Sequence, residues 1–432
     1  MIYRISTLLF LIFSSFLTSE LRIEITEGIK DPIRIAIVPI VWNLENPPRK
    51  YLHEIISSDL ESFGEFESLS PKEMLSLPKT DKELFYRDWK LLDVDYLVLG
   101  SASQGEVKGE VVVNFSLFNV TRERLMKRSI STGTTFYLNA LAHVISDRIY
   151  NEINGLPGIF STKNSYINKN NSSDEKYFLR VADIDGRNDS IIFSSTEPLM
   201  SPDWSSDGRR LAYVSFEEGT SRIFIQEIYT GKRKSLKLEK GINSSPNWSP
   251  SDRYLAAVLS KGDNPDIYRY DLEKDSWKQL TNHFGIDTEP DWSPDGKKII
   301  FTSNRSGTPQ IYEMTISNGK IRRKTFEGTY NARARYTPDG RSFVFVHRRD
   351  ELFHIAVQSL RTAKLQILTD TRLDESPTIS PNGKVIIYAT KEKEKDILAG
   401  ISIDGKTRFT LPTSSGGVRE PNWSPLLVST SN

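Results

Sequence analysis

The stretch TEPDWSPDGKKIIFTSNRSGTPQIYEM, residues 288–314, combines a Trp, a Ser-Pro-Asp-Gly turn and two alternating apolar segments. Similar segments recur along the chain, and each has an anchor residue directly before its turn. The anchors are Trp204, Trp248, Trp292, Tyr336, Ile379 and Trp423. Successive anchors are 44, 44, 44, 43 and 44 residues apart. A repeat of this length is typical of the four-stranded blade of a β-propeller.

The residue types within each unit match the turns and strands of a blade. Pro presets the backbone angle φ of the turn, and Gly tolerates the left-handed position that follows Asp. Residues 297–303 and 308–316 are rich in side chains that favour strands, and 321–326 has the charges of an exposed outer strand. In SPSDR, residues 249–253, Arg253 replaces the expected Gly, which predicts a different turn geometry. We expect the anchor aromatics to be core wedges between blades, not a ligand cage, and the adjacent Asp and Ser to be turn residues.

The two ends of the repeat region together predict a sixth blade. Residues 158–200 contain three predicted strands but no anchor strand, and the chain stops within ten residues of the last anchor. We therefore expect REPNWSP, residues 419–425, to pair with the strands of 158–200. A blade made from both ends closes the ring and removes an open sheet edge. The predicted propeller is all-β, has six blades and spans residues 158–432.

Residues 32–155 carry no repeat and predict a small α/β domain ahead of the propeller. The predicted elements are buried strands at 31–40 and 95–101, a hairpin at 109–133, and helices at 52–63 and 138–153. Gly155 is a plausible stop for the second helix. The predicted fold class is thus an α/β N-terminal domain followed by an all-β six-bladed propeller.

The N-terminus, MIYRISTLLFLIFSSFLTSE, differs in kind from the rest of the chain. Arg4 precedes an apolar run over 5–17 that is shorter than the roughly 20 residues needed to span a bilayer. This pattern favours a secretory signal peptide over 1–19, with an uncleaved anchor as the alternative. The mature chain would then begin at Glu20 and reside in the periplasm.

Composition excludes several function classes. Lys and Arg number 57 against 56 Asp and Glu, so the net charge of +1 gives no indication of nucleic-acid or direct membrane binding. The chain has no cysteine, which excludes disulfides, thiolate metal sites and a Cys nucleophile.

No motif for catalysis, a cofactor or a metal ion is present. The chain lacks a G-x-S-x-G nucleophile elbow and the glycine-rich phosphate loops. Its histidines, none with ligand spacing, are His53, His143, His283, His347 and His354. ADIDGRND, residues 182–189, is similar to a calcium loop, but its Gly follows the second Asp directly and Ser194 replaces the bidentate Glu. A hairpin turn is the better interpretation.

Four segments carry a resemblance to a known family. They are ELRIEITEGIKD (20–31), PLMSPDWSSDGRRLAYVSFEEG (198–219), IDTEPDW (286–292) and LDESPTISPNGKVIIYAT (373–390). Together with the signal peptide and the domain order, they resemble the TolB family, the periplasmic component of the Tol-Pal system. The resemblance implies a binding adaptor without enzymatic activity that supports outer-membrane integrity and envelope constriction during cell division. It implies two partners, the lipoprotein Pal and the protein TolA, with membrane association only through them, and a monomeric chain.

The resemblance also implies where the partners bind. Pal is expected on the propeller face formed by the loops before the anchor strands, although Ile242 departs from the polar residue usual there. The candidate Pal contacts are Ser245, Thr288, Glu289, Arg333, Arg335, Glu375 and Glu420. TolA is expected to bind the N-terminal segment 20–31. Its candidate contacts are Glu20, Leu21, Arg22, Ile23 and Ile25.

The N-terminal segment alternates apolar and polar residues, which indicates a strand with one apolar face. The alternative to a detachable TolA-binding peptide is an edge strand of the chain's own α/β domain. For the whole protein, the alternative to an adaptor is a propeller enzyme or a periplasmic ligand-binding protein.

Overall fold

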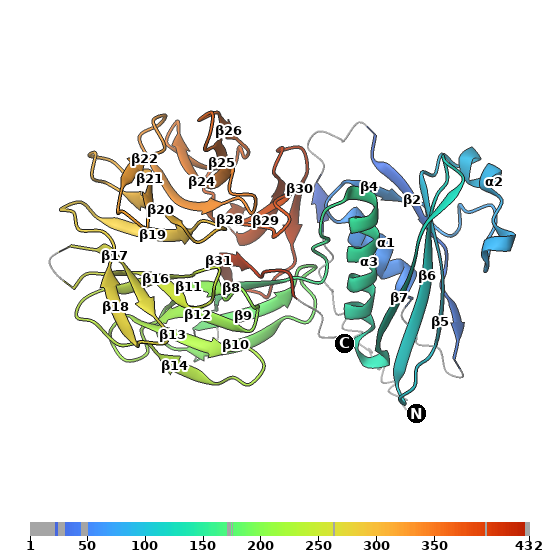
Figure 1. Cartoon of the computed structure of the whole chain (residues 1–432), viewed down its shortest axis with the longest axis horizontal. Coiled ribbons are helices and arrows are strands. Elements are labelled where there is room, and N and C mark those ends of the chain that lie inside the picture. The colour runs from blue at the N-terminus through green and yellow to red at the C-terminus, as the bar shows by residue number, and fades with distance from the viewer. Residues whose placement is uncertain are drawn as a thin grey trace, which may run out of the picture.

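The computed structural model describes residues 22–24, 31–44, 51–170, 174, 176–261, 264–393 and 395–427. An N-terminal α/β region lies beside a six-bladed propeller, and helices α1 (Leu52–Glu61) and α3 (Leu138–Asn154) lie between the N-terminal sheet and the propeller (Figure 1). The predicted fold class is therefore confirmed. The proposed signal peptide, residues 1–19, lies outside the described residues.

The N-terminal sheet has the strand order β4-β2-β5-β6-β7, and β3 also pairs with β5. Its strands are β2 (Ile33–Ile37), β3 (Val41–Asn43), β4 (Phe66–Ser68), β5 (Tyr96–Gln104), β6 (Glu110–Asn119) and β7 (Arg124–Thr134). Helices α1 and α3 pack on one face, and the short helix α2 (Tyr86–Leu91) packs on the other through Trp89. The short 3-10 helices η1 (Asp81–Glu83) and η2 (Thr135–Tyr137) complete the region.

Local sequence explains these elements. Alternate residues of β6, among them Val111, Val113 and Phe115, are buried in the core shared with α1 and α3, as a strand with one covered face requires. Helix α3 ends at Gly155, whose φ of 68° is the left-handed cap that favours glycine. The predicted hairpin and both predicted helices are present.

The propeller strands follow the repeat. They are β8 (Lys163–Lys169), β9 (Tyr177–Asp183), β10 (Ser190–Ser195), β11 (Leu199–Trp204), β12 (Arg210–Ser215), β13 (Arg222–Glu227), β14 (Arg233–Ser235), β15 (Asn243–Trp248), β16 (Tyr254–Leu259), β17 (Asp266–Asp271), β18 (Ser276–Gln279), β19 (Asp287–Trp292), β20 (Lys298–Ser303), β21 (Gln310–Thr315), β22 (Ile321–Arg323), β23 (Asn331–Tyr336), β24 (Ser342–Arg349), β25 (Leu352–Ser359), β26 (Leu365–Ile367), β27 (Glu375–Ile379), β28 (Val385–Glu392), β29 (Lys395–Ser402), β30 (Arg408–Leu411) and β31 (Gly417–Trp423). Strands β11 to β30 form five successive blades of four strands each. The sixth blade has the order β10-β9-β8-β31, so it combines strands from both ends of the propeller.

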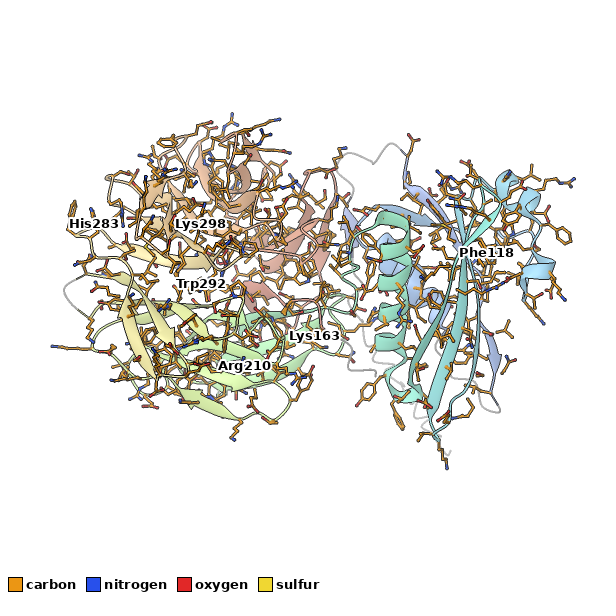
Figure 2. All side chains as sticks on the ribbon, in the orientation of Figure 1. Phe118, Lys163, Arg210, His283, Trp292 and Lys298 are labelled. Atoms are coloured by element: carbon orange, nitrogen blue, oxygen red, sulfur yellow. The ribbon has the colours of Figure 1, made fainter. Side chains whose placement is uncertain are left out.

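The anchor aromatics are wedges between blades, as predicted. Trp292 ends the first strand of the third blade, is 7% exposed, and packs with Ala256 and Ile267 of the second blade. Ile299, which pairs with Trp292 on the next strand of the same blade, belongs to the same core cluster. In Figure 2, Trp292 lies within the propeller, whereas His283 lies near its edge.

The C-terminal strand closes the ring in the predicted way. Strand β31 pairs antiparallel with β8, with Val418 opposite Asn168 and Trp423 opposite Asn164. The indole Nε1 of Trp423 donates a hydrogen bond to Thr162 Oγ1 at 2.8 Å.

The prediction of a different turn at Arg253 is wrong. In the other turns the left-handed position belongs to a glycine, for example Gly296 with φ of 68°. In the second blade this position is occupied by Asp252, with φ of 57°, and not by Arg253. Asp tolerates the left-handed region better than most residues, so the turn keeps the geometry of its counterparts.

The alternative placement of the N-terminal segment is also wrong. Strand β1 (Arg22–Glu24) pairs antiparallel with β30 at the outer edge of the fifth blade, and not with the sheet of the α/β region. Glu20, Leu21 and Ile25 lie outside the described residues. Among the helices that the structure describes, none is long and apolar enough to cross a membrane.

Candidate functional site

Six residues, each three positions before an anchor, line one mouth of the propeller channel. These residues, which we call the mouth ring, are Ser201, Ser245, Glu289, Arg333, Ser376 and Glu420. Their φ angles all lie between 48° and 55°, in the left-handed region. Such a backbone costs a non-glycine residue about 1–3 kcal/mol, and residues of this kind gather at functional sites. The mouth ring is therefore the first candidate for a binding site.

The local sequence produces this backbone. Each mouth-ring residue lies where the register shifts between the first and second strands of its blade. Five of the six are followed by Pro, and Arg333 is followed by Ala334. Pro donates no hydrogen bond to a neighbouring strand, so it is tolerated at a bulge. The extra residue of a bulge changes the direction in which side chains of the bulged strand point.

The charges of the mouth ring are paired within it. Arg333 Nε lies 3.0 Å from Glu289 Oε1, and Arg333 Nη2 lies 3.6 Å from Glu420 Oε1. Arg333 also donates to Ser376 Oγ. Burial lowers the pKa of Arg333, but the carboxylates of Glu289, Glu420 and Glu375 outweigh it and raise that pKa. One cation on the fourth blade thus holds carboxylates from the third and sixth blades.

A second ring lies deeper in the channel, formed by the residues directly before the anchors. This inner ring comprises Asp203, Asn247, Asp291, Arg335, Thr378 and Asn422. Five members accept a hydrogen bond from the anchor N–H of the next blade, for example Asp203 Oδ2 from Trp248 N at 2.7 Å and Asn422 Oδ1 from Trp204 N at 3.2 Å. These bonds connect neighbouring blades around the channel.

Arg335 is the exception in the inner ring because a guanidinium has no acceptor. It instead donates to Asp291 Oδ1 at 3.0 Å and lies 3.7 Å from Asp203 Oδ1 in the first blade. Burial raises the pKa of Asp203 to about 6, and the charge of Arg335 opposes that rise. Burial also raises the pKa of Asp291. Arg335 lines both the mouth cavity and the cavity that the inner ring lines.

Two family models match the chain. Residues 21–126 match the TolB amino-terminal domain, and residues 150–427 match the TolB beta propeller domain. The chain belongs to the TolB family. The second match alone covers more than half of the sequence.

Curated relatives and a solved structure agree with TolB membership. The chain is 50% identical to the Tol-Pal system protein TolB of Alcanivorax borkumensis, covering 95% of this chain and 94% of the relative. It is 52% identical to that of Nitrosococcus oceani, with coverages of 98% and 97%. The crystal structure of TolB from Acinetobacter baumannii superposes with a TM-score of 0.85 at 36% identity, covering 94% of this chain and all of that one. The chain is accordingly a non-enzymatic component of the Tol-Pal system.

The structure brings together most of the residues proposed from the TolB resemblance. Ser245, Glu289, Arg333, Arg335 and Glu420 all line the mouth cavity. Sequence reasoning missed the mouth-ring residues Ser201 and Ser376, although the position three before each anchor would have found all six.

Two proposed residues lie outside the mouth cavity as the structure describes it. Thr288 and Glu375 each precede a mouth-ring residue by one position, so they lie four positions before an anchor. Thr288 pairs with Thr302 in the ladder of the third blade. Glu375 lines a separate cavity together with Lys391 and Asp396.

Three of the loops that precede first strands carry exposed apolar side chains. Ile242, Phe284 and Phe326 lie in the loops that lead into the first strands, and their exposed fractions are 47%, 85% and 71%. The departure from the TolB pattern at Ile242 therefore places an exposed apolar side chain in one of these loops. Exposed large apolar groups beside a polar cavity are typical of a protein-binding surface.

One group elsewhere has the spacing of metal ligands. Within the described part of the chain, Asp59, His143 and Asp185 are the only such group, with ligand atoms within 4.8 Å of one another. Asp59 is bound to His143 Nδ1, and Asp185 faces Arg187 Nε at 3.4 Å. Both carboxylates thus have a protein partner, and this group lies apart from the channel mouth.

Proposed function

We propose that the chain is a periplasmic adaptor of the Tol-Pal system, acting as a monomer. It binds Pal at the channel mouth of the propeller and TolA through the N-terminal segment 20–31. By this link it supports outer-membrane integrity and envelope constriction during cell division. The observation that carries the proposal is the mouth ring, with six left-handed residues on one face of the propeller.

The chemistry of the mouth suits a protein partner. Glu289, Arg333 and Glu420 are only partly exposed, so their positions are fixed before a partner arrives. Pre-organised polar groups bind with less loss of side-chain freedom. Phe284 and Phe326 are exposed, and Phe is one of the residue types enriched in the buried centre of protein interfaces. A folded partner that inserts polar groups into the mouth would cover these rings.

The Pal site is tested by reversing charge on the third blade. In the variant Thr288→Arg/Glu289→Arg, a cation replaces the carboxylate that pairs with Arg333 Nε and accepts from Arg333 N at 3.0 Å. We expect Pal affinity to fall by about 100-fold, the size of a hot-spot substitution. Isothermal titration calorimetry measures the affinity.

The matched control for the Pal site is Asp295→Arg, which also replaces a carboxylate by a cation. Asp295 lies in the turn between β19 and β20 of the same blade. Its side chain is 56% exposed, and Pal affinity should stay at the wild-type value. An unchanged affinity of the double variant, in protein that melts like the wild type, would show that the proposed Pal site is wrong.

The N-terminal segment is suited to strand exchange. Strand β1 pairs with β30 at only three positions, from Arg22 opposite Thr410 to Glu24 opposite Arg408. A short terminal strand on a sheet edge is held by few hydrogen bonds, and such a segment can add instead to the exposed sheet of a partner. We infer that the segment alternates between the edge of the fifth blade and TolA.

Deletion of residues 20–31 tests this role. We expect TolA binding to vanish, because the backbone groups that would pair with TolA are removed. The melting temperature and Pal affinity should stay close to wild type, because the rest of the fold does not depend on this segment. The Thr288→Arg/Glu289→Arg variant is the matched control and should bind TolA normally. Retained TolA binding after the deletion would falsify the assignment.

A further inference from the structure

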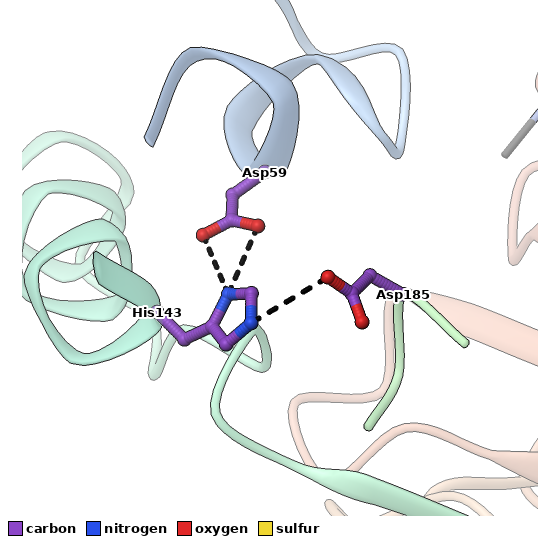
Figure 3. A group of neighbouring side chains, drawn as sticks. All are labelled: Asp59, His143 and Asp185. Carbon is purple, nitrogen blue, oxygen red and sulfur yellow. Dashed lines mark hydrogen bonds and ion pairs between the residues drawn. The ribbon is translucent and has the colours of Figure 1, made fainter. Parts of the chain in front are cut away.

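His143 is buried at the boundary between the N-terminal region and the propeller. It projects from α3, is 2% exposed, and lies between carboxylates on opposite sides of its ring (Figure 3). His143 Nδ1 lies 2.8 Å and 3.0 Å from the two oxygens of Asp59 on α1. His143 Nε2 lies 3.5 Å from Asp185 Oδ2.

The contact with Asp185 crosses between the two parts of the molecule. Asp185 belongs to the turn that joins β9 and β10 in the sixth blade, where the sequence predicted a hairpin. This turn is held in place: Gly186 has φ of 80° and its N–H donates to Asp183 O at 2.8 Å. A Cβ on Gly186 would lie 2.3 Å from Pro412, so the turn is packed closely against its neighbour.

The hydrogen bonds fix which nitrogen carries the first proton. Burial raises the pKa of Asp59, and its hydrogen bonds with His143 and Ser146 and the charge of His143 oppose that rise. As a carboxylate, Asp59 accepts from Ser146 Oγ at 2.7 Å and can only accept from His143 Nδ1. Nδ1 therefore carries a proton in both charge states of the ring. Nε2 has no hydrogen-bond partner among the side chains that the structure describes. In the neutral His143 ring the lone pair of Nε2 faces the carboxylate of Asp185. In the protonated ring the Nε2–H group faces that carboxylate.

Both carboxylates and cations surround the His143 ring. Asp183 lies in the same turn and pairs with Lys163, and Arg187 Nε lies 3.4 Å from Asp185 Oδ2. On α3, one turn beyond His143, Asp147 accepts from Phe160 N at 2.7 Å, and burial raises the pKa of Asp147 to about 6. Burial lowers the pKa of His143, but the hydrogen bond and charge of Asp59 and the charges of Asp185 and Asp183 outweigh it, so that pKa is raised.

We propose that His143 is a proton-operated clasp between the N-terminal region and the propeller. The doubly protonated ring bridges Asp59 of α1 and Asp185 of the sixth blade and holds the two parts together. Loss of the Nε2 proton leaves Asp59 bound but removes the attraction to Asp185, so the interface loosens.

The direction of the pH dependence follows from linkage. A histidine whose pKa is raised by folding contributes stability that is complete below its ordinary pKa of about 6.5. That contribution is lost as the pH rises through the raised value. The clasp is therefore closed in mildly acidic solution and opens toward alkaline pH.

Spin labels on both parts of the molecule test the clasp. Because the chain has no cysteine, Lys82→Cys and Lys232→Cys place two unique labels on exposed positions. We measure the distance between the two spin labels by pulsed electron paramagnetic resonance in buffer containing EDTA. We expect a narrow distribution of this distance at pH 6 and a broader one at pH 8. His143→Gln, which can still donate to Asp59 but cannot become charged, should lose this pH response.

Two further variants separate the clasp from other effects. Asp185→Asn should lose the pH response while leaving the bond between His143 and Asp59 intact. His347→Gln is the matched control, since His347 is buried within the fourth blade against Asn331, and it should respond like wild type. A pH-independent wild type, or a pH response retained in His143→Gln, would overturn the proposal. Narrowing at pH 8 on addition of zinc in buffer without EDTA, together with no response to pH, would overturn it in favour of a metal-operated contact.

Discussion

A chain that ends before Arg419 is expected to lose the cooperative unfolding transition of the intact propeller. The truncation removes residues 419–423 of β31, the strand that pairs with β8 and closes the sixth blade. It removes Trp423, which is 5% exposed, and loss of one large buried aromatic costs about 3–5 kcal/mol. It also removes Asn422, whose carbonyl oxygen accepts from Trp204 Nε1 at 3.0 Å in the first blade. Differential scanning calorimetry should therefore show a lowered and broadened transition.

Two matched chains show whether the closing strand is responsible. A chain that ends after Leu427 retains β31 and should melt like the full chain. Trp423→Ala retains the strand but removes the buried indole, and its melting temperature should lie between those of the two truncated chains. If the chain lacking residues 419–432 melts cooperatively at the wild-type temperature, ring closure by β31 does not stabilise the propeller. The exposed edge of β8 should also make that chain aggregate at lower concentration than the control.

The variant Arg335→Met is expected to lower the free energy of unfolding by about 3 kcal/mol at pH 7.5. Met has a similar length but no charge, so Asp203 and Asp291 remain buried without their shared cation. Breaking a buried ion pair costs about 3–5 kcal/mol, and we take the lower end because the Arg335 side chain is 29% exposed to the channel. Urea denaturation measures the difference.

The pH dependence distinguishes this effect from lost packing. The pKa of Asp203 is raised to about 6, so the folded state holds a proton there that the unfolded state has already released. Stability therefore falls as the pH rises from about 4 to about 6. Without Arg335 the pKa of Asp203 rises further, so the fall in stability continues up to neutral pH. At pH 5, where Asp203 is mostly protonated in both proteins, the stability of the variant should differ less from that of the wild type. Arg341→Met, at an exposed turn position, is the matched control and should change stability little at either pH. Equal destabilisation by Arg335→Met at both pH values would exclude the electrostatic explanation.

The sequence by itself determined the architecture of the propeller. The spacing of the anchors set the blade length. Residues 158–200 contain three predicted strands but no anchor strand, so the C-terminal strand β31 was needed to complete the sixth blade. These features are readable because each blade has the same local pattern of turn, strand and wedge. The helices α1 and α3 were predicted for the same reason, since their apolar spacing and the stop at Gly155 are local signals.

The candidate site was only partly predictable. The resemblance located Glu289, Arg333 and Glu420 correctly on the mouth, but it also included Thr288 and Glu375, which lie one position outside the ring. As Pal contacts these two residues stay predictions. The register shift in each first strand falls directly after them, so they do not line the cavity that the next residue lines. The placement of β1 on β30 likewise depends on a sheet edge that is almost 400 residues away in the chain.

Only the tertiary structure decided the contacts between distant elements. Arg335 meets Asp291 and Asp203 because ring closure brings the first, third and fourth blades to one axis. His143 meets Asp185 because packing of α3 against the sixth blade places a helix residue beside a hairpin turn. A repeat fixes the conformation of each unit through local backbone preferences, but the partner of a charged side chain depends on which units meet when the whole chain has folded.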